Sequence, residues 1–201
     1  MSKNIEVFFD VGSPASYLAW TQLPALAQRN DVQLIWKPML LGGVFKATGN
    51  QSPVTVPAKG KYTMVDFQRY ARLYDVPLKF NPYFPINTLQ LMRGVVAVLE
   101  SPDFSTYTDA VFTAIWVDGK NMGLPEVVAE VLAGAGFDPQ EIFALGNQEQ
   151  VKEKLKNLTE EAVARGVFGA PTFFLEGEMF FGQDRLGMLE STLRDSIKLP
   201  Q

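Results

Sequence analysis

Two short stretches near opposite ends of the chain carry residues that could do chemistry. In the first, an apolar run from Ile5 to Val11 ends at Gly12, and Ser13-Pro14 then opens a helix-forming segment. Ser13 can cap a helix through its side-chain oxygen, and Pro14 suits the first helical position because its missing N–H has no partner there. The Ser13 hydroxyl is therefore expected at a helix N-terminus, where free N–H groups and the dipole favour an anion. Taken alone, the same pattern is also that of an ordinary capped helix.

The second stretch lies between residues 166 and 185. Within the sequence GVFGAPTFFL, Pro171 opens an apolar strand, and a short hairpin then leads to Gln183-Asp184-Arg185. Asp184 stands near the start of the closing helix, where the dipole favours a carboxylate. That position alone could explain Asp184 as a cap.

The composition restricts the chemistry that the chain can perform. The 201 residues are 47% hydrophobic and include neither cysteine nor histidine, so cysteine nucleophiles, disulfides, serine–histidine triads and histidine-ligated zinc are excluded, and no metal site is expected. A reactive thiol would have to come from a cofactor. The net charge is −4 with no basic block, which argues against nucleic acid as a partner. There is no signal-like N-terminus and no apolar run of membrane-spanning length, so we expect a cytoplasmic protein without membrane contact.

Hydrophobic periodicity predicts the elements that would position these residues. Strands at 5–11 and 32–38 flank a helix at 14–29, which makes a parallel βαβ unit. Residues 39–61 are rich in turn signals and predict a long connection, either functional or a solvated linker. The remaining predicted elements are helices at 62–74, 87–99, 104–116, 124–135, 138–145 and 149–165, strands at 171–175 and 179–181, and a closing helix at 184–197.

This order of elements resembles the thioredoxin fold. Ser13-Pro14-Ala15-Ser16 stands where thioredoxins have C-x-x-C, and the resemblance implies that Pro171 follows a cis peptide bond and faces the first helix. The predicted fold class is α/β, a thioredoxin-like fold with a large all-helical insertion. Residues 1–60 and 166–201 would form a thioredoxin-like domain, and residues 61–165 the helical insertion domain.

Five motifs, in order along nearly the whole chain, resemble those of kappa-class glutathione transferases and bacterial 2-hydroxychromene-2-carboxylate isomerases, which share one fold. Each motif is weak alone, but the ordered set in a cysteine-free chain is specific. The motifs are FDVGSP at 9–14, GGVFKATGN at 42–50, VPAKGKY at 56–62, GVFGAPT at 166–172 and FGQDR at 181–185.

The resemblance implies that glutathione is the cofactor. Ser13 would be the catalytic serine, with its hydroxyl directed at the glutathione sulfur. The Ala170 backbone would pair with the cysteinyl part, as an added strand does, and Gln183 and Asp184 would hold the γ-glutamyl end. The full set of implied glutathione-binding residues is Ser13, Pro14, Ala15, Asn50, Pro57, Ala170, Pro171, Gln183 and Asp184. For Asn50 and Pro57, turn chemistry is the alternative explanation.

Substrate-binding residues are less defined. A carboxylate substrate would favour a cation near the sulfur, from Lys46, Lys59 or Arg185, and Tyr83 and Asn87 are candidates to line the pocket. Helix packing and capping explain the last two equally well. The chain departs from the family pattern in having Ala15 in place of an aromatic residue and Ala170 in place of Leu or Val, and both changes leave more space near the sulfur.

Simple energetics explain how a serine could serve here. Lowering a thiol pKa from about 8.5 to about 6.5 needs roughly 2.7 kcal/mol of preference for the thiolate. A helix N-terminus contributes up to about 2 kcal/mol, and a hydroxyl donating to the anion contributes about 1.5–3 kcal/mol. We therefore interpret Ser13 as a hydrogen-bond donor to an external thiolate, not as a covalent nucleophile.

The function that this sequence favours is a glutathione-dependent isomerase. It would convert 2-hydroxychromene-2-carboxylate to trans-o-hydroxybenzylidenepyruvate in naphthalene-type aromatic catabolism. A kappa-class glutathione transferase or peroxidase acting on small electrophiles is the alternative, and a non-catalytic thioredoxin-like binding module is a third possibility. The expected partners are a small aromatic substrate and a second copy of the chain, in a homodimer.

Overall fold

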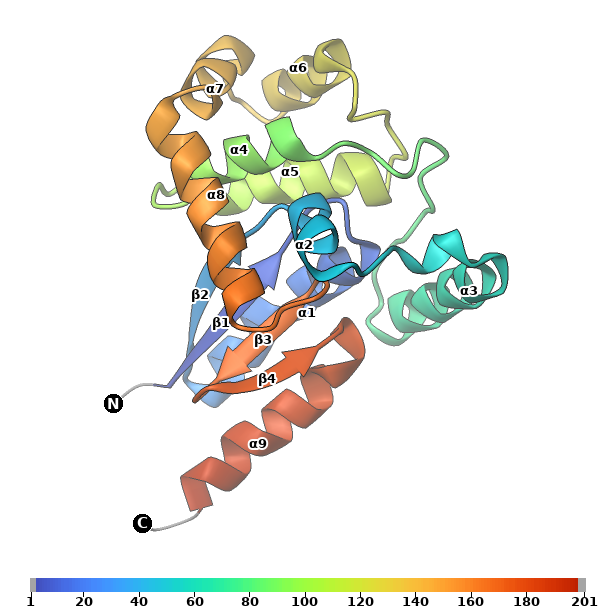
Figure 1. Ribbon diagram of the computed structural model, residues 1–201, viewed down its shortest axis with the longest axis vertical. Coiled ribbons are helices and arrows are strands. Elements are labelled where there is room, and N and C mark those ends of the chain that lie inside the picture. The colour runs from blue at the N-terminus through green and yellow to red at the C-terminus, as the bar shows by residue number, and fades with distance from the viewer. Residues whose placement is uncertain (1–2, 199–201) are drawn as a thin grey trace.

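The computed structural model describes residues 3–198, with side chains described through Arg194 (Figure 1). Its centre is a four-stranded sheet in the order β2-β1-β3-β4. The strands are β1 (Asn4–Phe9), β2 (Gln33–Pro38), β3 (Thr172–Leu175) and β4 (Glu178–Phe181). β1 runs parallel to β2 and antiparallel to β3, with Phe8 opposite Thr172. The C-terminal end of β1 and the start of β3 therefore meet at one edge of the sheet.

Helices make up most of the rest of the described chain. A short 3-10 turn, η1 (Pro53–Thr55), precedes α3, and η2 (Gln183–Arg185) precedes α9. The α-helices are α1 (Pro14–Asn30), α2 (Leu41–Thr48), α3 (Pro57–Leu73), α4 (Leu89–Ala97), α5 (Phe104–Trp116), α6 (Pro125–Gly134), α7 (Pro139–Gly146), α8 (Glu149–Ala164) and α9 (Leu186–Lys198). The predicted fold class, a thioredoxin-like sheet with a large helical insertion, is confirmed.

The sheet is covered on both faces. Ile5, Val7 and Phe173 pack beneath α1 and α9, whereas Phe8 and Phe174 face α2 and α8. α4 to α7 lie beyond one end of the sheet, as Figure 1 shows. One large apolar cluster joins the end of β1 and the first half of α1 to α4–α8, so the helical region shares its core with the α/β part.

The connection over residues 39–61 is the main error of the sequence prediction. It contains α2, η1 and the first turn of α3 instead of a long irregular segment. Gly42-Gly43 was interpreted as a turn, but Gly43 lies inside α2, where a Cβ would come 3.2 Å from Thr159 Cγ2 on α8. The glycine therefore permits a close helix–helix contact. The predicted domain boundary between residues 60 and 61 falls inside α3, and we keep the division into two parts as an interpretation.

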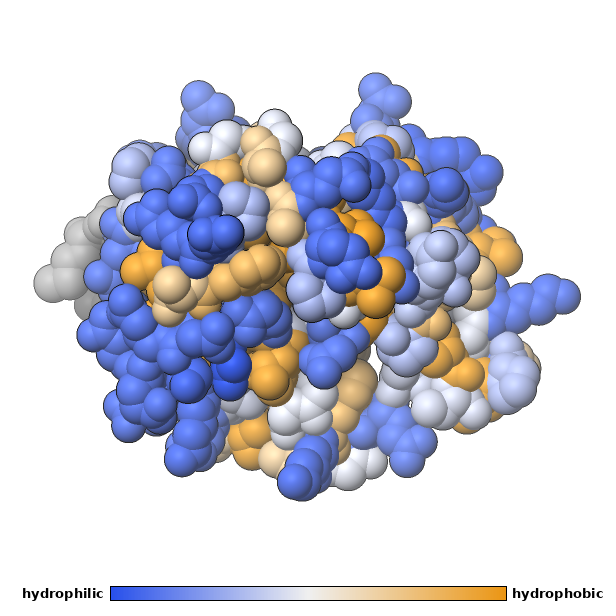
Figure 2. Space-filling view, turned by 90° about the horizontal axis from the view of Figure 1, so that it is seen from above, coloured by the Kyte–Doolittle hydropathy of each residue, from blue (hydrophilic) through white to orange (hydrophobic). Residues whose placement is uncertain are grey.

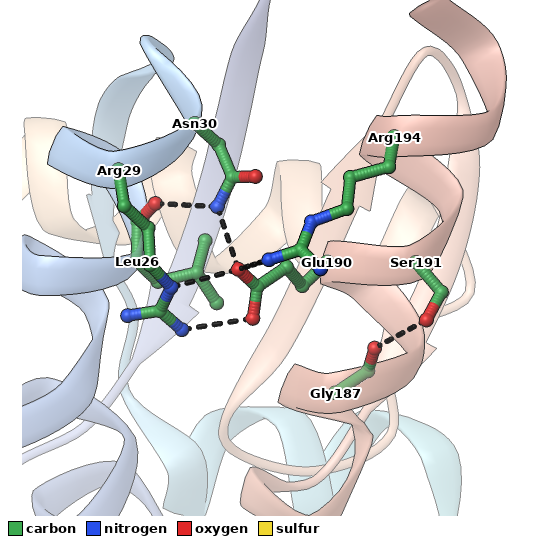
Figure 3. Close-up of polar contacts among 7 residues, drawn as sticks. All are labelled: Leu26, Arg29, Asn30, Gly187, Glu190, Ser191 and Arg194. Carbon is green, nitrogen blue, oxygen red and sulfur yellow. Dashed lines mark hydrogen bonds and ion pairs between the residues drawn. The ribbon is translucent and has the colours of Figure 1, made fainter. Parts of the chain in front are cut away.

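A polar cluster attaches the closing helix to α1 (Figure 3). Glu190 of α9 accepts hydrogen bonds from Arg29 at 2.7 and 2.8 Å, from Asn30 at 3.0 Å and from Arg194 at 2.7 Å. Asn30 also donates to the carbonyl of Leu26 at 2.8 Å, which fixes its amide. These partners, above all the hydrogen bonds from Arg29, lower the pKa of Glu190 to about 2.

The surface above the helical region is mostly hydrophilic. Figure 2 shows polar side chains over most of this face, with hydrophobic ones showing mainly in the furrows between them. Among residues 3–198, no helix combines the length and the apolar character needed to cross a membrane.

Candidate functional site

Ser13 lies at the N-terminus of α1, as predicted. Its Oγ accepts a hydrogen bond from the Ser16 amide at 3.1 Å, and Pro14 occupies the first helical position. The same hydroxyl donates to the Ala170 carbonyl oxygen at 3.0 Å. Ser13 is only 5% exposed, so its side chain is fixed between α1 and the loop before β3.

The Ala170–Pro171 peptide bond is cis, which confirms the prediction for Pro171. The predicted site residue Asn50 and the residue before Gln183 are also tied to this loop. Asn50 Nδ2 donates to the Phe168 carbonyl at 2.7 Å, and the Gly182 amide donates to the Pro171 carbonyl at 2.9 Å. Hydrogen bonds thus connect the loop before β3 to Ser13, to Asn50 and to the segment that carries Gln183.

Gln183 and Asp184 form the η2 turn next to this loop. Gln183 is 5% exposed, and its side-chain amide makes no hydrogen bond within the described part of the chain. Its carbonyl accepts a hydrogen bond from the Tyr74 hydroxyl at 2.9 Å, and burial raises the pKa of Tyr74 to about 12. Asp184 is exposed and pairs with Arg185 at 2.6 Å. The turn therefore offers a free amide and a carboxylate to a ligand.

Asp10 is a buried residue of the site that the sequence analysis missed. It is 1% exposed, and its Oδ1 accepts from the Gly12 amide at 2.8 Å. Its Oδ2 accepts from the Leu41 amide at 2.8 Å and from the Thr88 hydroxyl at 3.0 Å. Burial raises the pKa of Asp10, although these three donors act in the opposite direction. The signal in the sequence was a carboxylate at the end of an apolar run, two residues before Gly12.

The loop that carries Ser13 is closely packed. A Cβ on Gly12 would lie 2.7 Å from Thr88 Cγ2, so any other residue there would displace the Thr88 side chain. The Val11 carbonyl accepts from Trp116 Nε1 at 2.8 Å, which connects the loop to α5. Ser16 is a second overlooked residue, because its buried Oγ has no hydrogen-bond partner within the described chain.

The predicted substrate residues are not brought together with Ser13 by any contact in the described chain. Lys46 and Lys59 are exposed on α2 and α3, and Tyr83 is 53% exposed. Asn87 Oδ1 accepts from the Leu89 amide at 3.1 Å, which is the capping role considered as its alternative. Pro57 opens α3, is exposed, and has no described contact with the Ser13 cluster.

A small cavity of about 60 Å³ lies beside Pro14. Three aromatic side chains form part of its wall, and none of the predicted substrate residues does. The lining residues are Pro14, Met64, Phe67, Gln68, Leu78, Phe80 and Trp116. The space next to the serine loop is therefore apolar and bounded by α3, the segment after it, and α5.

This arrangement can hold an anion. Pro14 lacks an N–H, and the Ser16 and Tyr17 amides already donate to Ser13, so the Ala15 amide is the first-turn donor left for a ligand in the described chain. The dipole of α1 and the Ser13 hydroxyl act at the same point. Fold and site together define a thioredoxin-like protein in which serine replaces the reactive cysteine.

Comparison with known proteins agrees with this class. The family model of the DSBA-like thioredoxin domain matches residues 4–194. The 2-hydroxychromene-2-carboxylate isomerase of Pseudomonas putida is 34% identical over 94% of this chain and 93% of its own. Glutathione S-transferase kappa 1 of Rattus norvegicus is 30% identical over 92% of this chain and 88% of its own. A solved structure of 2-hydroxychromene-2-carboxylate isomerase superposes with a TM-score of 0.83 at 32% identity, covering 98% of this chain and all of the other.

The chain therefore belongs to the DSBA-like thioredoxin-domain family, among the relatives that include 2-hydroxychromene-2-carboxylate isomerases and kappa-class glutathione transferases. The resemblance inferred from its motifs is confirmed.

Proposed function

We propose that the protein is a glutathione-dependent isomerase that acts on 2-hydroxychromene-2-carboxylate in aromatic catabolism. The observation that carries the proposal is the contact of Ser13, at the N-terminus of α1, with the carbonyl before cis-Pro171, in a chain 34% identical to an isomerase of this kind. Cytoplasmic location and a homodimeric state belong to the same proposal.

The residues present fit glutathione. The Gln183 side-chain amide makes no hydrogen bond in the described chain, and the neighbouring Asp184 carboxylate suits an ammonium group. Ser13, Pro14 and Ala15 would face the thiol end, Ala170 and Pro171 would hold the cysteinyl backbone, and Asn50 and Pro57 would close the site. Bound glutathione would supply the nucleophilic thiol that a chain without cysteine lacks.

The chain's own residues would stabilise negative charge and orient the substrate. The Ser13 hydroxyl would donate to an anion at the end of α1, and the Ala15 amide would donate beside it. The aromatic walls formed by Phe67, Phe80 and Trp116 offer an apolar surface for an aromatic ring next to Pro14. Lys46, Lys59, Arg185, Tyr83 and Asn87 remain candidates to contact the substrate carboxylate or line its pocket.

The test is the ultraviolet absorbance of 2-hydroxychromene-2-carboxylate mixed with the protein, with and without glutathione. We expect conversion to the open-chain product that depends on glutathione and leaves its concentration unchanged. Calorimetry should detect glutathione binding in the absence of substrate. No conversion at millimolar glutathione would refute the isomerase.

A kappa-class transferase is the second candidate, because the rat kappa enzyme is 30% identical to this chain. It would consume glutathione and leave it on the product of a small electrophile. Thiol consumption with an aryl halide, without isomerisation of the chromene, would favour the transferase. A protein that binds no glutathione at millimolar concentration would instead be a non-catalytic thioredoxin-like module.

A further inference from the structure

A groove among α2, α4 and α8 lies apart from the site around Ser13. α8 packs against both α2 and α4 (Figure 1). The groove between them has a volume of about 640 Å³. Cavities of roughly 300–1,000 Å³ are typical of small-molecule sites. Ser13, Ala170 and Gln183 are not among its lining residues. The groove is therefore large enough for a ligand of its own.

Much of the groove wall is apolar. Gly43 and Ala47 lie one turn apart on α2. Glycine has no side chain and alanine only a methyl group, so α2 leaves the space open. The other two helices supply larger aliphatic groups at helical spacing. The apolar lining residues are Leu40, Ala47, Leu89, Leu155, Val163 and Ala164. Such a wall suits a hydrocarbon chain or ring.

Three cations, one carboxylate and the Thr159 side chain complete the lining, which gives an excess of positive charge. Lys152 and Lys156 are on α8, and Arg93 is on α4, one turn after Leu89. Lys156 makes a loose pair with Glu160 at 3.7 Å, and Lys152 pairs with the exposed Glu149 at 3.5 Å. Both lysine pairs are open to solvent and can yield to a ligand.

Arg93 differs from the two lysines. Its Nε is buried and has no hydrogen-bond partner, and no carboxylate of the described chain forms an ion pair with its guanidinium. A buried N–H of a cation without an acceptor is unfavourable. A planar guanidinium matches a carboxylate, to which it can donate two parallel hydrogen bonds. The buried Nε is itself closed to a ligand, but Arg93 lines the groove and is only partly buried, so an incoming carboxylate would pair with this cation without competition from a carboxylate of the described chain.

We propose that the groove binds a small amphipathic carboxylate, with its anionic head at Arg93 and its hydrocarbon body along Leu40, Leu89 and Leu155. The head also lies in the field of Lys152 and Lys156. This proposal does not rest on the activity proposed for the Ser13 site, because the groove shares no lining residue with the Ser13, Ala170 and Gln183 cluster.

Calorimetry with decanoate as the probe tests the proposal on the full chain at low ionic strength. Decanoate should bind, decanol should bind at least about 10-fold more weakly, and added salt should weaken decanoate alone. Arg93→Gln should weaken decanoate by about 10- to 100-fold and leave decanol unchanged. Arg72→Gln, which changes an exposed arginine of α3, is the matched control and should have no effect.

Two further measurements locate the probe. Ala47→Phe should fill the groove and abolish binding without changing any charged residue. It therefore tests the site even if circular dichroism shows that Arg93→Gln does not fold. Saturating glutathione should change the decanoate affinity by less than about twofold, since the groove and the Ser13 site are separate. Absence of decanoate binding at millimolar concentration would overturn the proposal. So would wild-type affinity for decanoate in both Arg93→Gln and Ala47→Phe, or displacement of decanoate by glutathione.

Discussion

At the scale of the residue, the Ser13 hydroxyl has one proton and already uses it. It donates to the Ala170 carbonyl while accepting from the Ser16 amide. Donation to a thiolate would therefore replace an existing hydrogen bond instead of adding one. The net stabilisation should lie near the lower end of the range for a hydroxyl–anion bond, about 1.5 kcal/mol.

Ser13→Ala is expected to reduce the ionised fraction of bound glutathione at neutral pH about 10-fold. The pH–rate profile should move upward by about one unit, and high pH should partly restore activity. Loss of the cap and of the bond to Ala170 should lower the free energy of unfolding by about 1–2 kcal/mol. Glutathione should still bind, because Gln183 and Asp184 would hold its other end.

Ser16→Ala is the control for this variant, as it removes a hydroxyl that has no hydrogen-bond partner in the described chain. We expect little change in stability or in the pH–rate profile. Activity of Ser13→Ala equal to the wild type at pH 7 would mean that Ser13 is only a helix cap.

At the scale of the elements, the Asp10 carboxylate joins three segments that are distant in sequence. Its three donors are the Gly12 amide after β1, the Leu41 amide at the start of α2 and the Thr88 hydroxyl before α4. The carboxylate at the N-terminus of α2 is also favoured by the dipole of that helix. Asp10 thus helps to position the loop that carries Ser13.

Asp10→Asn should destabilise the protein by about 1–3 kcal/mol, since an amide offers one acceptor oxygen where three donors converge. Urea denaturation followed by circular dichroism measures the change. Asp118→Asn is the matched control, because Asp118 is exposed, and its effect should stay within about 0.5 kcal/mol. Equal stability of the two variants would show that Asp10 does not join these segments.

The attachment of α9 to α1 predicts a dependence of stability on pH. The pKa of Glu190 falls from 4.5 to about 2 in the folded protein, so its contribution is complete above about pH 4.5 and is lost as the pH falls toward 2. Glu190→Gln should lower the free energy of unfolding by about 1 kcal/mol at pH 7. The effect is limited because Arg29 is exposed to solvent.

Denaturation of the wild type and of Glu190→Gln at pH 7 and pH 3 measures this effect, with the exposed Glu178→Gln as control. The difference between wild type and Glu190→Gln should be smaller at pH 3. A difference that is the same at both pH values would contradict the assignment.

At the scale of the whole molecule, the sheet places residues from the two ends of the chain side by side. β1 and β3 pair with Ile5 opposite Leu175, and this pairing brings Ser13 to Ala170. The helical region then adds the walls around Pro14 through Phe80 and Trp116. The site therefore depends on packing across the entire described chain.

We expect a homodimer in solution. Tyr62, Val65 and Leu73 are apolar side chains of α3 that are 62%, 46% and 73% exposed, which is surface that a second copy could cover. Light scattering should give a mass near twice 22.3 kDa. A mass near 22.3 kDa itself would contradict this prediction.

The sequence by itself determined the ground plan and the position of Ser13. Local signals carried most of these predictions: hydrophobic periodicity for the helices and the Ser13-Pro14 pair for the start of α1, whereas the resemblance to the thioredoxin fold implied the cis bond before Pro171. α5 was predicted with its observed bounds, Phe104–Trp116. These features depend on neighbours in the chain, so a single sequence is sufficient to predict them.

Only the tertiary structure decided the features that depend on contacts between distant residues. Gly43 lies in a helix that packs closely against α8, whereas two adjacent glycines by themselves indicate a turn. Asp10 acquires its role from donors 31 and 78 residues away. The groove at Arg93 is the space that three helices leave between them. The described chain offers no acceptor to the Nε of Arg93. Burial and hydrogen-bond partners of this kind arise from packing, which has no local pattern in the sequence.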